Sequence, residues 1–187
     1  TLSQDMLPDG LDLWMQCGIQ NGNEAMVPPE LITPDVAFIN RQDWKADNKY
    51  DEYKKAFSER KFNRMICPTI IYRRNGWYMK NIVQDVFEPM IKRGMNCLFV
   101  NFEPNARVKA DDGCFCDRCF NEFAEYTGIG RNELKKGWPV NISEKYGEKW
   151  NAFRNWQYGM ILRVMDEDLV NYGRKFNRNV YMTVAIA

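Results

Sequence analysis

Three cysteines stand within six residues in Cys114-Phe115-Cys116-Asp117-Arg118-Cys119. Three thiols this close together cannot all pair with one another, so a shared metal ion is the simplest use for them. Three thiolates leave a tetrahedral zinc ion one ligand short. We expect Cys67 to be the fourth ligand, because it lies in the predicted strand before the one that leads to the cluster. The set predicts a structural zinc site with four cysteine ligands, since four thiolates leave no open position for water.

The alternatives for these thiols are a disulfide between two of them, or free thiols at the surface. Cys114 and Cys116 are too close in sequence to bridge without strain, and several exposed thiols would oxidise easily. Only one CxxC arm, from Cys116 to Cys119, is present, whereas zinc sites often use two. Cys17 and Cys97 lie among apolar residues, where a thiol usually serves as a small core residue.

A carboxylate precedes the cysteine cluster at the end of an apolar run, Cys97 to Pro104. Strand periodicity places Asn101 and Glu103 on the same face, so both polar groups can point toward the mouth of a barrel. In a glycosidase, one such carboxyl group donates a proton to the leaving oxygen, and a second carboxyl group is needed. The alternative is an ion pair between Glu103 and Arg73 or Arg74.

Asn101 is a candidate substrate contact, and polar and aromatic residues at other strand ends are further candidates. Arg41 and Trp44 follow the second predicted strand, and Arg73 and Trp77 follow the third. Sugar sites commonly combine an aromatic platform with side chains that form several hydrogen bonds. Each of these residues is also compatible with an ordinary solvated loop.

Composition excludes several classes of function. The chain of 187 residues contains no histidine, which excludes Ser-His-Asp and Cys-His catalysis as well as histidine ligands to zinc. Lys and Arg number 26 against 25 Asp and Glu, so no net field attracts nucleic acid or an anionic membrane. No apolar run approaches the roughly 20 residues that span a bilayer. The chain resembles an excerpt of a longer protein without its targeting segment, so both a cytoplasmic and a secreted location are compatible with the sequence. The sequence does not determine the oligomeric state.

Short apolar runs alternate with amphipathic stretches, which is typical of βα units around a parallel sheet. The predicted strands are Leu11–Cys17, Val36–Asn40, Arg64–Tyr72, Asn96–Glu103 and Val180–Ile186. The predicted helices are Tyr50–Phe62, Met79–Arg93, Asp117–Tyr126 and Glu148–Phe176. We expect an α/β fold in which residues 1–187 form the N-terminal portion, about five βα units, of a single (β/α)8 TIM barrel. A doubly wound open sheet is the alternative, but no glycine-rich phosphate loop supports it.

The middle of the chain resembles the β-galactosidases of glycoside hydrolase family forty-two, or a related uncharacterised glycosidase-like TIM-barrel family. The resemblance covers about residues 64–156 and rests on Asn101-Phe102-Glu103-Pro104, the segment Gly113 to Phe123, Leu134, Trp138, Trp150 and Phe153. It implies that Glu103 is the acid/base, that the CxCxxC loop binds zinc with an upstream cysteine near the position of Cys67, and that hydrolysis retains configuration. Phe102 departs from the family pattern, in which Asn and Glu are adjacent, and the family's nucleophilic Glu comes from a later strand.

These observations predict a glycoside hydrolase that acts on a carbohydrate substrate through Glu103 and carries a structural zinc ion. The alternative is a non-catalytic carbohydrate-binding barrel derived from such an enzyme. A redox or nucleic-acid module built on the thiols is disfavoured, because basic clustering and a second CxxC arm are both missing. We expect no nucleic-acid and no membrane partner.

Overall fold

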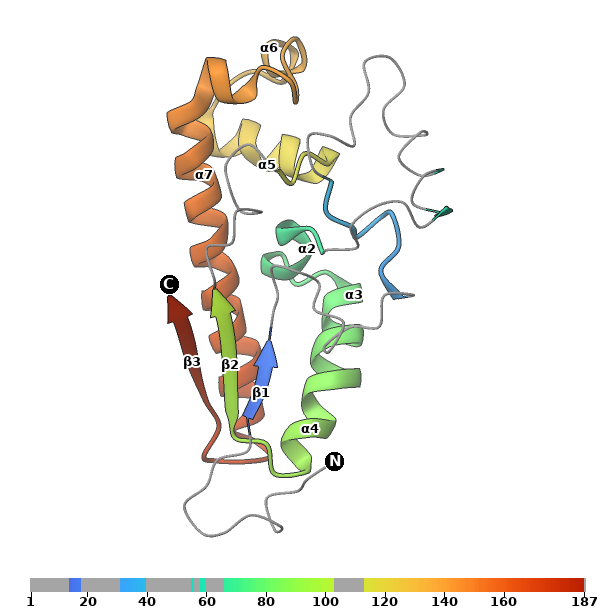
Figure 1. Ribbon diagram of the computed structural model, residues 1–187, viewed down its shortest axis with the longest axis vertical. Helices are drawn as coiled ribbons and strands as arrows, with labels where there is room; N and C mark the ends of the chain where they lie inside the picture. Colours follow the sequence, from blue (N-terminus) through green and yellow to red (C-terminus); the bar gives the residue numbers. More distant parts are fainter. Residues whose placement is uncertain are drawn as a thin grey trace.

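A small parallel sheet organises the described part of the chain. The computed structural model describes residues 14–17, 31–39, 55, 58–59, 66–102 and 113–186. Strands β1 (Trp14–Cys17), β2 (Cys97–Phe102) and β3 (Tyr181–Ile186) pair in sequence order, with β2 in the centre. Cys97 is in register with Trp14 on one side and with Tyr181 on the other. Figure 1 shows all three strands running in the same direction.

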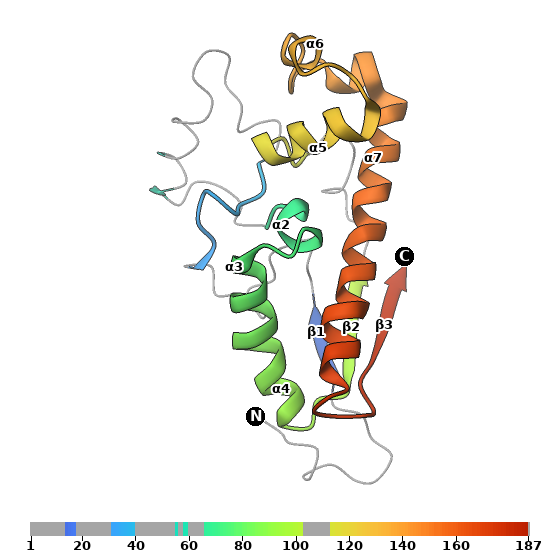
Figure 2. The ribbon, with the colours of Figure 1, turned by 180° about the vertical axis from the view of Figure 1, so that it is seen from behind.

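Helices form both connections between the strands. Between β1 and β2 the chain forms α2 (Pro68–Tyr72), α3 (Gly76–Tyr78), the π-helical segment η5 (Met79–Phe87) and α4 (Glu88–Lys92). Between β2 and β3 it forms α5 (Asp117–Thr127), α6 (Arg131–Lys135), α7 (Ile142–Met165) and the π-helical segment η8 (Asp166–Asn171). Figure 2 shows α7 crossing one face of the sheet. Parallel strands require such crossovers, because a tight hairpin can join only antiparallel strands.

The long helix α7 carries residues of two separate cores. Near its start, Trp150 and Phe153 pack into an aromatic cluster that includes Phe123 from α5. Further along, apolar residues of α7, such as Ile161, pack with Leu98 of β2 and with residues of η5. Apolar residues at three- and four-residue spacing line one face of a helix, and this pattern allowed the sequence to predict α7. The helix therefore links the sheet to the layer that contains α5.

The helix predicted over Met79–Arg93 is confirmed, and the structure adds a helical turn at its start. Asn75 precedes α3, and its side-chain Oδ1 accepts a hydrogen bond from the backbone N–H of Trp77 at 2.8 Å. This is the usual N-terminal cap of a helix. The predicted helix at Asp117–Tyr126 is also confirmed, as α5. The predicted helix Tyr50–Phe62 lies almost entirely outside the described residues.

The predicted TIM-barrel portion is wrong for the described part of the chain, which has only three short strands in one sheet rather than five. Within the segment predicted as strand Arg64–Tyr72, the residues Pro68–Tyr72 form helix α2, which Pro68 begins at its first position. Proline suits that position because its fixed φ is helical and it has no N–H to leave unpaired. Residues 36–39 contribute only an isolated antiparallel bridge between Ala37 and Ile66. A short buried apolar run has no periodicity that separates a strand from a helical turn.

No helix among the described residues combines the length and the apolar character that crossing a bilayer requires.

Candidate metal centre

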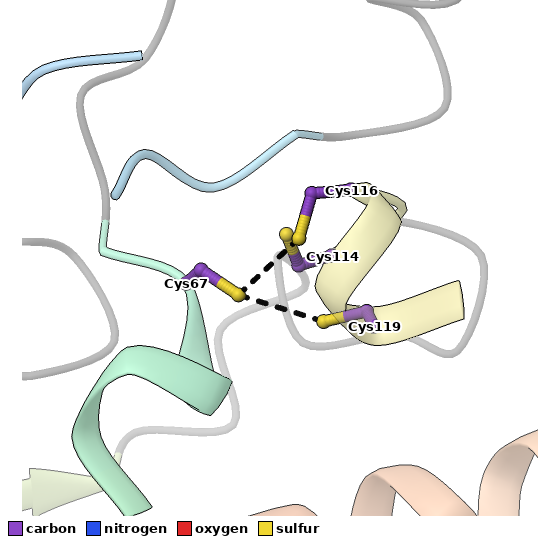
Figure 3. Close-up of side chains that lie close together, drawn as sticks. All are labelled: Cys67, Cys114, Cys116 and Cys119. Atoms are coloured by element: carbon purple, nitrogen blue, oxygen red, sulfur yellow. Dashed lines mark hydrogen bonds between the residues drawn. The ribbon is translucent and has the colours of Figure 1, made fainter. Parts of the chain in front are cut away.

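Four cysteine side chains converge between α2 and α5. Cys67 directly precedes α2, Cys114 lies in the loop before α5, and Cys116 and Cys119 lie at the start of α5 (Figure 3). All four are buried, and their sulfur atoms lie within 4.8 Å of one another. The predicted ligand set is therefore brought together, including Cys67 from a distant part of the chain.

The spacing of the sulfur atoms suits a tetrahedral thiolate site. Cys67 Sγ lies 3.5 Å from Cys116 Sγ and 3.5 Å from Cys119 Sγ. An ion bound at about 2.3 Å by four tetrahedral thiolates would hold its sulfurs about 3.8 Å apart. None of the five cysteines whose side chains are described is in a disulfide, so the disulfide alternative does not apply to them. The fifth, Cys97, is fully buried in β2, as predicted. The structure does not describe the side chain of Cys17.

A short segment, residues 36–39, holds the two halves of the site together. The backbone N–H of Cys67 donates to Val36 O at 2.8 Å, and the N–H of Phe115 donates to Ile39 O at 2.7 Å. The N–H of Ile39 in turn donates to Cys114 Sγ at 3.2 Å. An N–H that points at a sulfur stabilises the thiolate form and orients the ligand. The segment thus connects Cys67 to the loop that carries the other three cysteines.

The loop before α5 divides its side chains between the metal site and the aromatic cluster. Phe115, between two of the cysteines, is fully buried and stacks on Trp150 with ring centroids 5.2 Å apart. The indole N–H of Trp138 donates to Phe115 O at 3.2 Å. Because Phe115 is fixed on one side, Cys114 and Cys116 are held toward Cys67. The alternation Cys-Phe-Cys therefore has a packing explanation as well as a chemical one.

Polar side chains from α2 and α7 surround Cys119. Its sulfur lies 3.5 Å from Thr69 Oγ1, and Gln157 Nε2 donates to it at 3.7 Å. The hydroxyl of Tyr72 joins both groups, at 3.2 Å from Thr69 Oγ1 and 3.2 Å from Gln157 Nε2. Burial raises the pKa of Tyr72 far above its usual value, so the phenol stays protonated. These contacts provide the outer hydrogen bonds that metal-bound thiolates usually have.

The four thiols do not share the same electrostatic environment. Burial raises the pKa of Cys67, but hydrogen bonds from Cys114, Cys116 and Cys119 and the charge of Arg118 outweigh it, and the pKa is lowered well below its usual value. Burial raises the pKa of Cys114 well above the usual range. The hydrogen bond with Cys114 lowers the pKa of Cys116, but interactions with Cys119 and Cys67 together with burial outweigh it, and the pKa is raised. Of these three thiols, Cys67 therefore ionises most readily, and a bound cation would favour the thiolate forms of Cys114 and Cys116.

No protein-family model, curated protein or solved structure matches this chain. The assignment of the site therefore depends on the geometry and the chemistry of its residues. The structure establishes a buried cluster of four cysteines that could hold a metal ion.

The predicted catalytic and sugar-binding residues are only partly described. Glu103, Arg41 and Trp44 lie outside the described residues, and only the backbone of Asn101 is described, in β2 and in register with Ala185. Glu103, the residue predicted to be the acid, directly follows β2 in sequence, because β2 ends at Phe102.

The two predicted sugar contacts that are described have partners within the protein. Arg73 forms two hydrogen bonds to the carboxylate of Glu122, both at 2.8 Å. Its neighbour Arg74 pairs with Asp168, with Nε at 2.9 Å from Oδ2. The indole N–H of Trp77 donates to Leu31 O at 3.1 Å. In these contacts the side chains join α2 and α3 to neighbouring segments.

Sequence reasoning missed Arg154 and Gln157, which are buried on α7 beside the cluster. A signal for them exists in the sequence. Both stand at positions of the apolar stripe defined by Trp150, Phe153 and Ile161, where a polar residue needs a buried partner.

Proposed function

We propose that Cys67, Cys114, Cys116 and Cys119 bind one Zn²⁺ ion in a closed structural site. The observation that carries the proposal is the convergence of four buried sulfurs within 4.8 Å of one another. Tetrahedral thiolate sites hold zinc or iron, and zinc needs no redox partner. Four thiolates leave no position for substrate or water, so the ion stabilises the fold and takes no part in chemistry.

Metal analysis of the purified protein tests this proposal. We expect one zinc per chain by mass spectrometry, and we expect Co²⁺ substitution to give the absorption bands of tetrahedral cobalt thiolate. Cys67→Ser should remove most of the metal. Cys97→Ser is the matched control, because Cys97 is equally buried but lies outside the cluster. A wild-type protein without metal, or equal metal content in both variants, would refute the zinc site.

We propose further that the protein is a glycoside hydrolase with Glu103 as its acid. The resemblance to family forty-two β-galactosidases implied one upstream cysteine as the fourth ligand, and Cys67 occupies that place. The three parallel strands also end on one side of the sheet, toward α2 and α5 in both views (Figures 1 and 2). Ligands of open α/β sheets bind at the carboxyl ends of the strands, and Glu103 is the residue that follows β2 in sequence.

A panel of chromogenic glycosides, tested on the longest natural chain that contains these residues, checks this second proposal. We expect hydrolysis by the wild type and a loss of at least about a hundredfold in Glu103→Gln, since general acid catalysis contributes about 10² to 10⁴ in rate. Metal content should not change in this variant. Undiminished hydrolysis in Glu103→Gln would remove this residue from the mechanism. Sugar binding by a wild type that hydrolyses nothing would favour the carbohydrate-binding alternative.

A further inference from the structure

A buried arginine stands beside the cysteine cluster without a carboxylate to balance its charge. Arg154 of α7 is 2% exposed. Its terminal nitrogens donate to two neutral groups, the amide oxygen of Gln157 and the hydroxyl of Tyr158, the latter at 3.1 Å. Its Nε has no hydrogen-bond partner. Among the residues that the structure describes, no carboxylate forms an ion pair with it.

A buried guanidinium in this situation needs negative charge nearby, because an unpaired charge in the protein interior is strongly destabilising. The cysteine cluster can supply this charge. Gln157 lies between them, since its oxygen accepts from Arg154 while its Nε2 donates to Cys119 Sγ at 3.7 Å. The amide dipole is therefore aligned with its positive end toward the sulfur and its negative end toward the guanidinium. The aromatic rings of Phe38 and Trp150 exclude water around the guanidinium group of Arg154, whose Cζ lies 5.9 Å from each ring centroid.

A second arginine belongs to the cluster's own loop. Arg118 lies inside the CxCxxC motif, and its Nε is buried without a hydrogen-bond partner. It has no ion pair with a carboxylate in the described ranges. Its place in the motif, two residues after Cys116 and directly before Cys119, puts its charge next to the cluster, whereas Arg154 reaches Cys119 through Gln157.

We propose that Arg118 and Arg154 are the counter-charges of a metal-thiolate centre and select a divalent ion for it. A divalent cation with four thiolates carries two negative charges, which the two guanidinium groups balance. A trivalent ion would leave one positive charge uncompensated in the protein interior. Four protonated thiols without a metal ion would leave two positive charges uncompensated. The inference rests on the metal site proposed above and adds the residues that determine its charge state.

Metal affinity is the first test. Arg154→Met and Arg118→Met each remove one positive charge at similar side-chain volume, and Arg154→Lys keeps the charge. Arg163→Met is the matched control, because Arg163 lies on the same helix but its side chain is 68% exposed and pairs with Glu167. In competition with a chromogenic chelator, we expect each Met variant to bind zinc about 10- to 100-fold more weakly, the range typical of outer-shell partners. Arg154→Lys should recover much of the loss, and Arg163→Met should match the wild type.

The reduction potential of the iron-substituted protein is the second test, and a purely structural role would not change it in a fixed direction. The ferrous centre carries one more negative charge than the ferric centre, so nearby positive charge favours the ferrous form. We expect the potential to fall in both Met variants and to stay near the wild-type value in Arg163→Met and Arg154→Lys. If Arg154→Met does not fold, Arg118→Met, at a half-buried position, carries the same test.

Two outcomes separate the two proposals. A wild-type protein that binds neither zinc nor iron refutes the metal site itself. A wild type that binds metal, with Met variants equal to Arg163→Met in affinity and potential, leaves the metal site intact and overturns the role of the arginines.

Discussion

Substituting Gly113 by alanine perturbs the metal site without touching a ligand. Gly113 directly precedes Cys114, and its φ of +109° lies in a region that residues with a side chain rarely adopt. A Cβ atom at this position would lie 2.5 Å from Ile39 O, which is far inside van der Waals contact. The same oxygen accepts the hydrogen bond from the N–H of Phe115. The loop can therefore reach residues 36–39 only because position 113 has no side chain.

The expected magnitude follows from these two terms. Forcing alanine into such a backbone conformation costs about 1–3 kcal/mol. Displacing Ile39 O weakens one buried hydrogen bond, worth about 1 kcal/mol. The sum is about 2–4 kcal/mol, and it acts on the loop shape that places Cys114 and Cys116. We therefore expect the affinity for zinc to fall by a factor between about 30 and about 1,000.

Gly128→Ala is the matched control for this prediction. Gly128 ends α5 with a φ of +69°, but a Cβ there would meet nothing within 4 Å. We expect a loss of about 1 kcal/mol of stability and no change in zinc affinity, since the site lies at the opposite end of α5. Chelator competition measures the affinity, and denaturant unfolding measures the stability. Equal zinc affinity in Gly113→Ala and the wild type would refute the close approach of the loop to Ile39.

Three other perturbations have distinct expected results. Removing the metal with a strong chelator under reducing conditions should lower the free energy of unfolding by about 4 kcal/mol. The reason is that the proposed ion cross-links Cys67 to Cys116 across 49 positions of sequence. An unchanged thermal midpoint would contradict a structural ion. Trp150→Ala, in the centre of the aromatic cluster, should cost about 3–5 kcal/mol in denaturant unfolding. Arg73→Ala removes an ion pair in which the arginine side chain is 52% exposed and the Glu122 side chain 13% exposed, and should lower stability by about 1 kcal/mol.

The cysteine site could be predicted from sequence because its information is mostly local. Cys114, Cys116 and Cys119 are fixed relative to one another by a short loop and the first turn of α5, whatever the rest of the chain does. Choosing Cys67 depends on proximity in the fold, and the sequence pattern assigns this residue to the wrong element. The pattern predicts a strand around Cys67, whereas the residue directly precedes a helical turn that Pro68 begins. The choice of residue is right because the turn also brings this part of the chain to the loop before α5.

Local patterns missed the buried Arg154 and wrongly predicted a barrel for the same physical reason. Arg154 occupies a buried position of α7 where Gln157 and Tyr158 accept its hydrogen bonds. The contact of Gln157 with Cys119 becomes visible only when α5 and α7 are assembled. Likewise, the apolar segment around Ile70 satisfies either a strand or a helical turn. Tertiary contacts decide between such alternatives, and sequence periodicity does not.

The closed coordination proposed for the cluster limits where chemistry could occur. Four thiolates fill the ligand positions of a tetrahedral ion, so a substrate cannot bind the metal without displacing a cysteine. Chemistry must therefore use other groups, and the carboxyl end of β2, which Glu103 follows in sequence, is where parallel sheets usually place them. Under the proposed glycosidase function, loss of the ion should reduce activity only together with folding, whereas Glu103→Gln should reduce activity at least about a hundredfold in a protein that remains folded and loaded with metal. Measuring both properties in the same two samples distinguishes a structural ion from a catalytic one.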